Sequence, residues 1–273
     1  HYKIYNYIII IYILMYIISH RGGSLEVSEN TEEAIRYSLE IDVNGIEVDI
    51  YFTKDNIPII NHDPNLNRLY NLDTYISDIN YDELCNKTQD KILSLEKTLE
   101  IIDGNKCLFI EIKGDPSEEN LKKLSIILFD YSNKHIDIIN SEPKDKLYLF
   151  MILSFNYNSL KYLSKFFIPD ILMFLVSGIY TNNIIRYILH DKIFNNIGLN
   201  YGNLCIDNMK LYNNKNINIY LYTVNYENTY IHLKEKLKEK KMNINEIIKG
   251  FITDRPHYFL ETNIINNYQN QKK

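Results

Sequence analysis

A short apolar segment that carries two carboxylates is the feature of this chain that most constrains its fold. The segment reads Gly-Ile-Glu-Val-Asp-Ile-Tyr over residues 45–51. Side chains alternate between the two faces of a strand, so Glu47 and Asp49 share one face and the aliphatic residues between them share the other. Two adjacent carboxylates are costly to bury unless a cation neutralises them. The segment therefore predicts a strand with helices packed on one face and half of a metal site on the other.

Strand-like and helix-like segments alternate along the chain, which favours a parallel sheet with crossover helices. The predicted strands cover residues 14–19, 45–51, 57–61, 106–113, 147–153, 171–176, 219–224 and 250–253. Eight strand–helix units close a TIM barrel, an α/β fold of roughly 250 residues. The sixth unit is the least secure, because residues 204–206 compete with residues 171–176 for the strand.

The whole chain, residues 1–273, is expected to form one TIM-barrel domain with a small inserted cap over about residues 63–95. That segment is polar, weakly periodic and too long for an ordinary connection. Helices are expected over residues 94–102, 118–131 and 227–241. A further helix is expected to start near Asn30, which forms a capping-box pattern with Glu33.

Polar residues fall at the carboxyl ends of the first four predicted strands, where the catalytic groups of a TIM barrel lie. These residues are His20 after the first strand, Glu47 and Asp49 on the second, His62 after the third, and Glu111 and Lys113 on the fourth. Three carboxylates suit a hard cation, Mg²⁺ or Ca²⁺, better than zinc. Two imidazoles suit a general acid and a general base. Arg21 and Lys113 add positive charge for an anionic substrate, most simply a phosphate.

Each of these residues also has an ordinary structural interpretation. A single histidine is more often exposed or structural than catalytic. Glu47 and Asp49 could form a solvated strand face, and Lys113 could form a surface ion pair. Asn30 is interpreted as a helix cap, with Glu29 beside it within reach of the site. The co-occurrence of all these groups at strand ends of one polarity is what favours a catalytic site.

Composition limits the classes of partner. The 273 residues carry a net charge of −5, with a pI near 5.8, and so lack the basic excess of a nucleic-acid binder. Three cysteines without metal-type spacing indicate a reduced compartment and no disulfide framework. A cytoplasmic location is favoured on this ground.

The N-terminus leaves alternatives open. Residues 5–18 are almost continuously apolar, which is compatible with a signal-peptide core, a membrane anchor or a first barrel strand with an apolar extension. Secretion and membrane contact through this segment therefore stay open. Because the chain begins at His1 rather than Met, a fragment and a processed form are both open as well.

The motifs together resemble the glycerophosphodiester phosphodiesterase family, whose superfamily includes the phosphatidylinositol-specific phospholipases C. The matching segments are His-Arg-Gly at 20–22, Glu-Asn-Thr at 29–31, Gly-Ile-Glu-Val-Asp at 45–49, His-Asp at 62–63, Ile-Leu-Ser-Leu-Glu at 92–96, Glu-Ile-Lys at 111–113, Leu-Ser-Phe-Asn at 153–156, Thr-Val-Asn at 223–225 and Ile-Thr-Asp-Arg-Pro at 252–256. They run in the family's order through nearly the whole chain. Any one tripeptide would be a weak signal, whereas the ordered set is a strong one.

The resemblance implies a metal-dependent enzyme that cleaves glycerophosphodiesters to an alcohol and sn-glycerol 3-phosphate, in glycerophospholipid metabolism. It implies that Glu47, Asp49 and Glu111 hold one divalent cation and that His20 and His62 are the acid–base pair. By analogy, the glycerol 2-hydroxyl attacks phosphorus, the alcohol leaves, and water opens the resulting cyclic phosphate.

The sequence departs from the family pattern at two places. Tyr222 stands where the family usually has tryptophan, and Ser28 stands where it usually has proline. Neither is a proposed ligand or acid–base group. Two alternatives remain: a lysophospholipase-D-like lipid phosphodiesterase, and a catalytically silent barrel that binds phosphodiesters.

Overall fold

Eight parallel strands form a closed barrel in the computed structural model, which describes residues 15–141, 148–178 and 190–262. The barrel strands are β1 (Tyr16–Ser19), β2 (Gly45–Phe52), β4 (Cys107–Ile112), β5 (Phe150–Ser154), β6 (Leu172–Val176), β7 (Asn196–Asn200), β8 (Asn218–Tyr222) and β9 (Ile248–Thr253). Each pairs in parallel with its neighbours, and β1 closes the barrel by pairing with both β9 and β2. The predicted TIM barrel is confirmed.

The assignment of the barrel strands was wrong at two places. The predicted third strand is β3 (Pro58–Ile60), which pairs antiparallel with β2 and adds to the barrel as a hairpin. A parallel neighbour needs a crossover of a dozen or more residues, and residues 53–57 form only a tight connection. The hairpin therefore reverses the chain and returns it toward the carboxylates of β2.

Strand β7 was missed in the sequence. It reads Asn-Ile-Gly-Leu-Asn, and its polar ends and central glycine hide the apolar signal of a barrel strand. A Cβ atom at Gly198 would lie 2.4 Å from Leu175 Cδ2 on β6, so a larger residue here would displace the Leu175 side chain. Residues 204–206, the competing prediction, follow η4 (Tyr201–Asn203) and lead into α9 (Ile206–Asn214).

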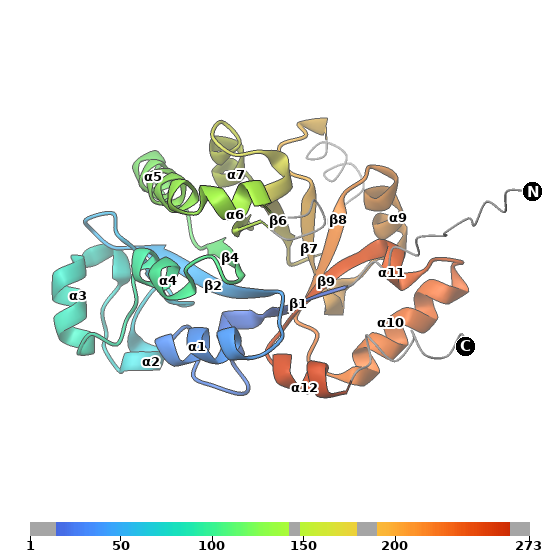
Figure 1. Ribbon diagram of the computed structural model, residues 1–273, viewed down its shortest axis with the longest axis horizontal. Coiled ribbons are helices and arrows are strands. Elements are labelled where there is room, and N and C mark those ends of the chain that lie inside the picture. Colours follow the sequence, from blue (N-terminus) through green and yellow to red (C-terminus); the bar gives the residue numbers. More distant parts are fainter. Residues whose placement is uncertain (1–14, 142–147, 179–189, 263–273) are drawn as a thin grey trace, which may run out of the picture.

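Helices surround the barrel on its outside (Figure 1). They are α1 (Glu32–Glu40), α4 (Leu95–Ile102), α5 (Glu118–Lys134), α6 (Ile136–Ser141), α7 (Tyr157–Leu163), α9, α10 (Glu227–Glu239), α11 (Ile244–Ile247) and α12 (Pro256–Glu261). The three helices predicted over 94–102, 118–131 and 227–241 are present with shifted ends. Ile46, Val48 and Ile50 on β2 are fully buried, so the apolar face of the acidic strand packs as predicted.

The segment between β3 and α4 packs around a small core of its own, and we call it the cap segment (residues 63–94). It contains α2 (Asn67–Tyr70), η2 (Ile76–Asp78) and α3 (Tyr81–Thr88), which lie at the left edge of Figure 1. Its buried side chains, with Ile59 of β3, are Leu66, Ile76, Ile79, Leu84 and Ile92. The predictions for residues 1–14 lie outside the described residues. Among the described helices, none combines the length and hydropathy needed to cross a bilayer.

Candidate active site

Three carboxylates meet at the carboxyl ends of β2 and β4. Asp49 and Glu111 are direct cross-strand partners, and Glu47 lies two residues earlier on the same face of β2. One oxygen from each of the three lies within 4.8 Å of the others. All three residues are buried, with exposed fractions of 1% for Glu47, 0% for Asp49 and 7% for Glu111.

Burial makes this carboxylate cluster electrostatically strained. Burial, followed by repulsion from Asp49, raises the pKa of Glu47 to about 8. Burial and Asp49 likewise raise the pKa of Glu111. Asp49 behaves in the opposite way: burial would raise its pKa, but the charges of Lys113 and Arg21 lower it. In the absence of a cation, Asp49 therefore stays ionised, whereas Glu47 and Glu111 bind a proton more readily than ordinary glutamates do.

Two cations lie against Asp49. The Lys113 Nζ atom is 2.9 Å from Asp49 Oδ1 and 2.5 Å from Glu111 Oε1. The Arg21 Nε atom is 3.3 Å from Asp49 Oδ2, and the Arg21 backbone N–H donates to Glu47 Oε2 at 2.9 Å. Both predicted phosphate-binding residues thus point into the acidic centre.

Asn30 belongs to the site and does not cap the following helix, contrary to the prediction. The Thr31 side chain caps α1 by accepting from the Ala34 N–H. Asn30 is 98% buried with a φ of +55°, and its amide donates to Asp49 Oδ2 at 2.9 Å. Because asparagine tolerates the left-handed region better than most residues, it can turn inward at this position.

His20 lies in η1 (His20–Gly22), directly after β1. Its Nδ1 atom is 2.5 Å from Asp254 Oδ1, and its Nε2 atom is 3.8 Å from Glu47 Oε2. Burial lowers the pKa of His20, but the carboxylates of Glu47 and Asp254 outweigh that effect, and the pKa is raised above 6.5. Asp254 follows β9 and also accepts from Ser24 Oγ and Asn225 Nδ2.

His62 reaches the site through the β2–β3 hairpin. The Asn61 N–H donates to the Asp49 carbonyl at 3.0 Å, which sets His62 beside the end of β2. The His62 Nδ1 atom is 2.7 Å from Asp63 Oδ1. Burial is the largest influence on the pKa of His62, which is lowered, and the charges of Lys113 and Arg21 act in the same direction.

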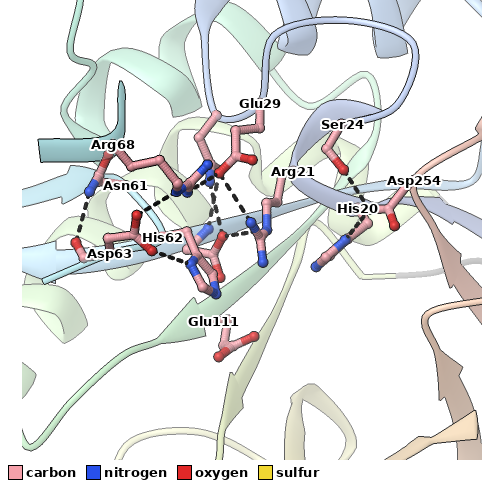
Figure 2. A network of polar contacts seen from close by, with 12 residues as sticks. His20, Arg21, Ser24, Glu29, Asn61, His62, Asp63, Arg68, Glu111 and Asp254 are labelled. Atoms are coloured by element: carbon pink, nitrogen blue, oxygen red, sulfur yellow. Dashed lines mark hydrogen bonds and ion pairs between the residues drawn. The ribbon is translucent and has the colours of Figure 1, made fainter. Parts of the chain in front are cut away.

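A chain of ion pairs joins the two sides of the site (Figure 2). Arg68 of α2 donates from Nε to Asp63 Oδ2 and from Nη2 to Glu29 Oε1, both at 2.6 Å. The same Glu29 oxygen accepts from Arg21 Nη1 at 3.1 Å. Glu29 therefore does reach the site, as an ion-pair partner of Arg21.

Reasoning from sequence assigned no role to Asp63, Arg68, Asn225 or Asp254. Asp63, Asn225 and Asp254 lie in recognised motifs, and the available signal for Asp63 and Asp254 was an acidic residue next to a strand end, whereas Arg68 lies outside those motifs. In a closed barrel the end of β9 lies beside that of β1, which brings Asp254 to His20. That proximity could have been predicted from the closure of the barrel.

The donor set fits a divalent cation. Three oxygen ligands converge, and Glu47 Oε1 is a buried oxygen that has no hydrogen-bond partner among the described residues. Buried polar atoms are normally satisfied, and a hard cation bound through oxygens would satisfy this one. The buried acidic triad can therefore bind a metal ion.

The fold and the site define a TIM barrel with an acidic centre, flanked by two histidines, at the carboxyl ends of its strands. Residues 20–258 match the model of the glycerophosphoryl diester phosphodiesterase family. The chain belongs to that family, as the sequence motifs predicted.

Relatives and solved structures agree with this membership. Human lysophospholipase D GDPD1 is 30% identical over 150 residues, which cover 48% of this chain and 47% of that protein. Human glycerophosphodiester phosphodiesterase 1 is 31% identical over 122 residues, covering 39% of this chain and 37% of that protein. The chain thus spans at most about half the length of these relatives.

The fold is shared with solved structures at low sequence identity. A glycerophosphodiester phosphodiesterase from Thermotoga maritima superposes with a TM-score of 0.69 at 24% identity, covering 91% of this chain and 98% of that one. An Oleispira antarctica phosphodiesterase, solved in complex with the product sn-glycerol-3-phosphate, gives a TM-score of 0.70 at 22% identity, covering 91% and 96%.

Proposed function

We propose that this chain is a single-domain, metal-dependent glycerophosphodiester phosphodiesterase that releases an alcohol and sn-glycerol 3-phosphate. The observation that carries the proposal is the convergence of three buried carboxylates, two histidines and two cations at one end of the barrel. A diester phosphate needs charge neutralisation and proton transfer on both of its sides. We assign the neutralisation to the metal centre with Arg21 and Lys113, and the proton transfers to His20 and His62.

We assign Glu47, Asp49 and Glu111 as ligands of one Mg²⁺ or Ca²⁺ ion. When bound, this ion would polarise a phosphoryl oxygen and lower the pKa of the attacking hydroxyl. Lys113 now lies across Asp49 and Glu111 at 2.9 and 2.5 Å, and we infer that its charge turns toward the phosphate when the carboxylates have a cation. Arg21 supplies a second positive charge and is fixed by Glu29 and Asp49.

The surroundings of the two histidines suggest different roles. The lowered pKa of His62 keeps its imidazole neutral near pH 7, and its Nδ1–H donates a hydrogen bond to Asp63, so Nε2 carries the lone pair that can accept a proton. We assign His62 to remove the proton from the glycerol 2-hydroxyl as that oxygen attacks phosphorus. The raised pKa of His20 favours the imidazolium, which donates its proton to the alcohol as the P–O bond breaks. The attack leaves a cyclic phosphate. In the second step the roles reverse: His20 removes a proton from the attacking water, and His62 returns a proton to the glycerol 2-oxygen as the ring opens.

A lysophospholipase D activity is the second candidate, because human lysophospholipase D GDPD1 is among the relatives of 30% identity. The same chemistry would then act on a substrate that keeps one acyl chain. One exposed aromatic side chain lies after β5: Phe155 is 39% exposed and makes an edge contact with the half-buried Tyr222. Such a surface could accommodate either a small head group or an acyl chain.

A product assay tests the proposal and separates the two candidates. The full chain with Mg²⁺ or Ca²⁺ is given glycerophosphocholine or lysophosphatidylcholine, and glycerol 3-phosphate, lysophosphatidic acid and choline are measured. Glycerol 3-phosphate from the first substrate supports the leading proposal. Lysophosphatidic acid from the second alone supports the lysophospholipase D activity. Binding of both without release of any product would favour the catalytically silent barrel.

A further inference from the structure

Arg68 of the cap segment forms ion pairs on both sides of the site. It lies on α2, and its guanidinium contacts Asp63 on the His62 side and Glu29 on the Arg21 side. Both contacts are 2.6 Å long and use different nitrogens, so one planar group fixes the positions of two carboxylates. Neither carboxylate is a proposed metal ligand.

Besides its contact with Arg68, each of these carboxylates also accepts a hydrogen bond from a side chain of the proposed active site. Asp63 accepts from His62 through Oδ1 and from Arg68 through Oδ2, so both of its oxygens are committed. Glu29 Oε1 accepts from both Arg68 and Arg21, and Arg21 in turn lies against Asp49. Arg68 is thus one contact removed from the imidazole of His62 and one contact removed from the guanidinium of Arg21.

The position of Arg68 is set by the cap segment and not by the barrel. Leu66, two residues earlier, is fully buried in the small core of that segment, and its N–H donates to the Thr74 carbonyl. Glu29 lies on the β1–α1 loop. Glu29 lines a cavity of about 530 Å³ together with Leu69 and Tyr70 of the cap segment. The Arg68–Glu29 ion pair therefore connects the cap segment to the β1–α1 loop, and both of these contribute to the lining of this cavity.

We propose that Arg68 is a positioning residue that fixes the tautomer and orientation of His62, and the direction of Arg21, through Asp63 and Glu29. This role rests on the proposed function: we expect Arg68 to affect the rate of the chemical step without contacting the substrate. Partners of this kind, one contact removed from the reacting groups, typically change activity by about 10- to 100-fold when removed. An exposed ion pair contributes little to stability, and Arg68 is 45% exposed, so the fold should persist without it.

The variant Arg68→Met tests this role against a matched control. Arg36→Met removes an arginine of similar exposure that pairs with Glu32 on the surface of α1. We expect Arg68→Met to lower kcat about 10- to 100-fold with KM unchanged, and its melting temperature to match that of Arg36→Met. In a double-mutant cycle with Asp63→Asn, the two losses in kcat should be less than multiplicative, since both act through His62.

A second measurement is independent of turnover. Nitrogen-15 shifts of the His62 ring, recorded on the full chain without substrate, should show the Nδ1-protonated tautomer in the wild type and a mixture in Arg68→Met. A wild-type kcat together with an unchanged His62 tautomer in Arg68→Met would overturn the inference. A rise in KM with kcat and tautomer unchanged would instead make Arg68 a substrate-binding residue and also overturn it. If the wild type shows no turnover, the proposed function fails while the ring shifts still decide the role of Arg68.

Discussion

Asp49 and Glu111 are directly opposite each other on neighbouring parallel strands, and Lys113 lies across both carboxylates. A cross-strand pair of buried like charges is unfavourable by itself. Glu47 lies two residues before Asp49 on the same face, so the three carboxylates together attract a cation. The raised pKa values of Glu47 and Glu111 and the lowered pKa of Asp49 follow from this arrangement of charges.

The metal-free protein should lose stability as the pH rises. The ordinary pKa of Glu47 is 4.5 and its folded value is about 8, so the folded state binds more protons between these values than the unfolded state does. The contribution of Glu47 to the free energy of unfolding is therefore fully present below pH about 4.5 and is lost as the pH rises to about 8. Urea unfolding of metal-stripped protein at several pH values measures this slope.

Glu47→Gln should reduce that slope, leaving the smaller part that comes from the raised pKa values of Glu111 and His20, and should raise the stability of the metal-free protein at pH 8. Glu100→Gln, on an exposed residue that pairs with Lys97, is the matched control and should keep the wild-type slope. Mg²⁺ or Ca²⁺ at about 100 times Kd should stabilise the wild type by about 2.7 kcal/mol and Glu47→Gln by less. An unaltered slope in Glu47→Gln would contradict the burial of a strained carboxyl group.

Removal of either histidine should abolish most turnover and leave folding intact. His20→Ala and His62→Ala are each expected to lower kcat by about 10²- to 10⁴-fold, the usual contribution of a general acid or base. His190→Ala, which alters a side chain that is 88% exposed, should behave as wild type. Steady-state kinetics measures the loss of kcat, and circular dichroism shows whether the variants fold. Normal turnover in either site variant would refute the acid–base role of the histidine that was replaced.

The pH dependence of kcat should be bell-shaped, and Asp254 should control its alkaline side. Turnover in this scheme needs neutral His62, with a pKa below 6.5, and protonated His20, with a pKa above 6.5. Asp254→Asn removes a carboxylate that stabilises the imidazolium of His20, so the pKa of His20 falls and the alkaline limb moves to lower pH. A profile that keeps its alkaline limb in Asp254→Asn would show that His20 does not titrate there.

Much of the site could be predicted from the sequence, because strand alternation alone places Glu47 and Asp49 on one face. The same reasoning located Glu111 and Lys113 on the neighbouring strand. Asn30 was misinterpreted because an asparagine before a helix is usually a cap, and only the left-handed backbone at this residue turns its amide toward Asp49.

The fold was predicted correctly from a strand count that contained two compensating errors. β3 was counted as a barrel strand although its short connection allows only a hairpin, and β7 was passed over because glycine and asparagine mask its pattern. The partners of the histidines were missed for a different reason. Asp254 is 234 residues from His20 in sequence, and Arg68 depends on how the cap segment packs, so neither contact can be read from local periodicity.

Glycerol 3-phosphate release from glycerophosphocholine by metal-stripped protein, as Mg²⁺ or Ca²⁺ is titrated back, tests most directly whether Glu47, Asp49 and Glu111 hold a catalytic cation. We expect no release without the ion and a saturable recovery that corresponds to one bound ion per chain. Asp49→Asn and Glu111→Gln should fail to recover at the same concentrations. Full turnover by the stripped wild type would show that these three carboxylates do not hold a catalytic cation.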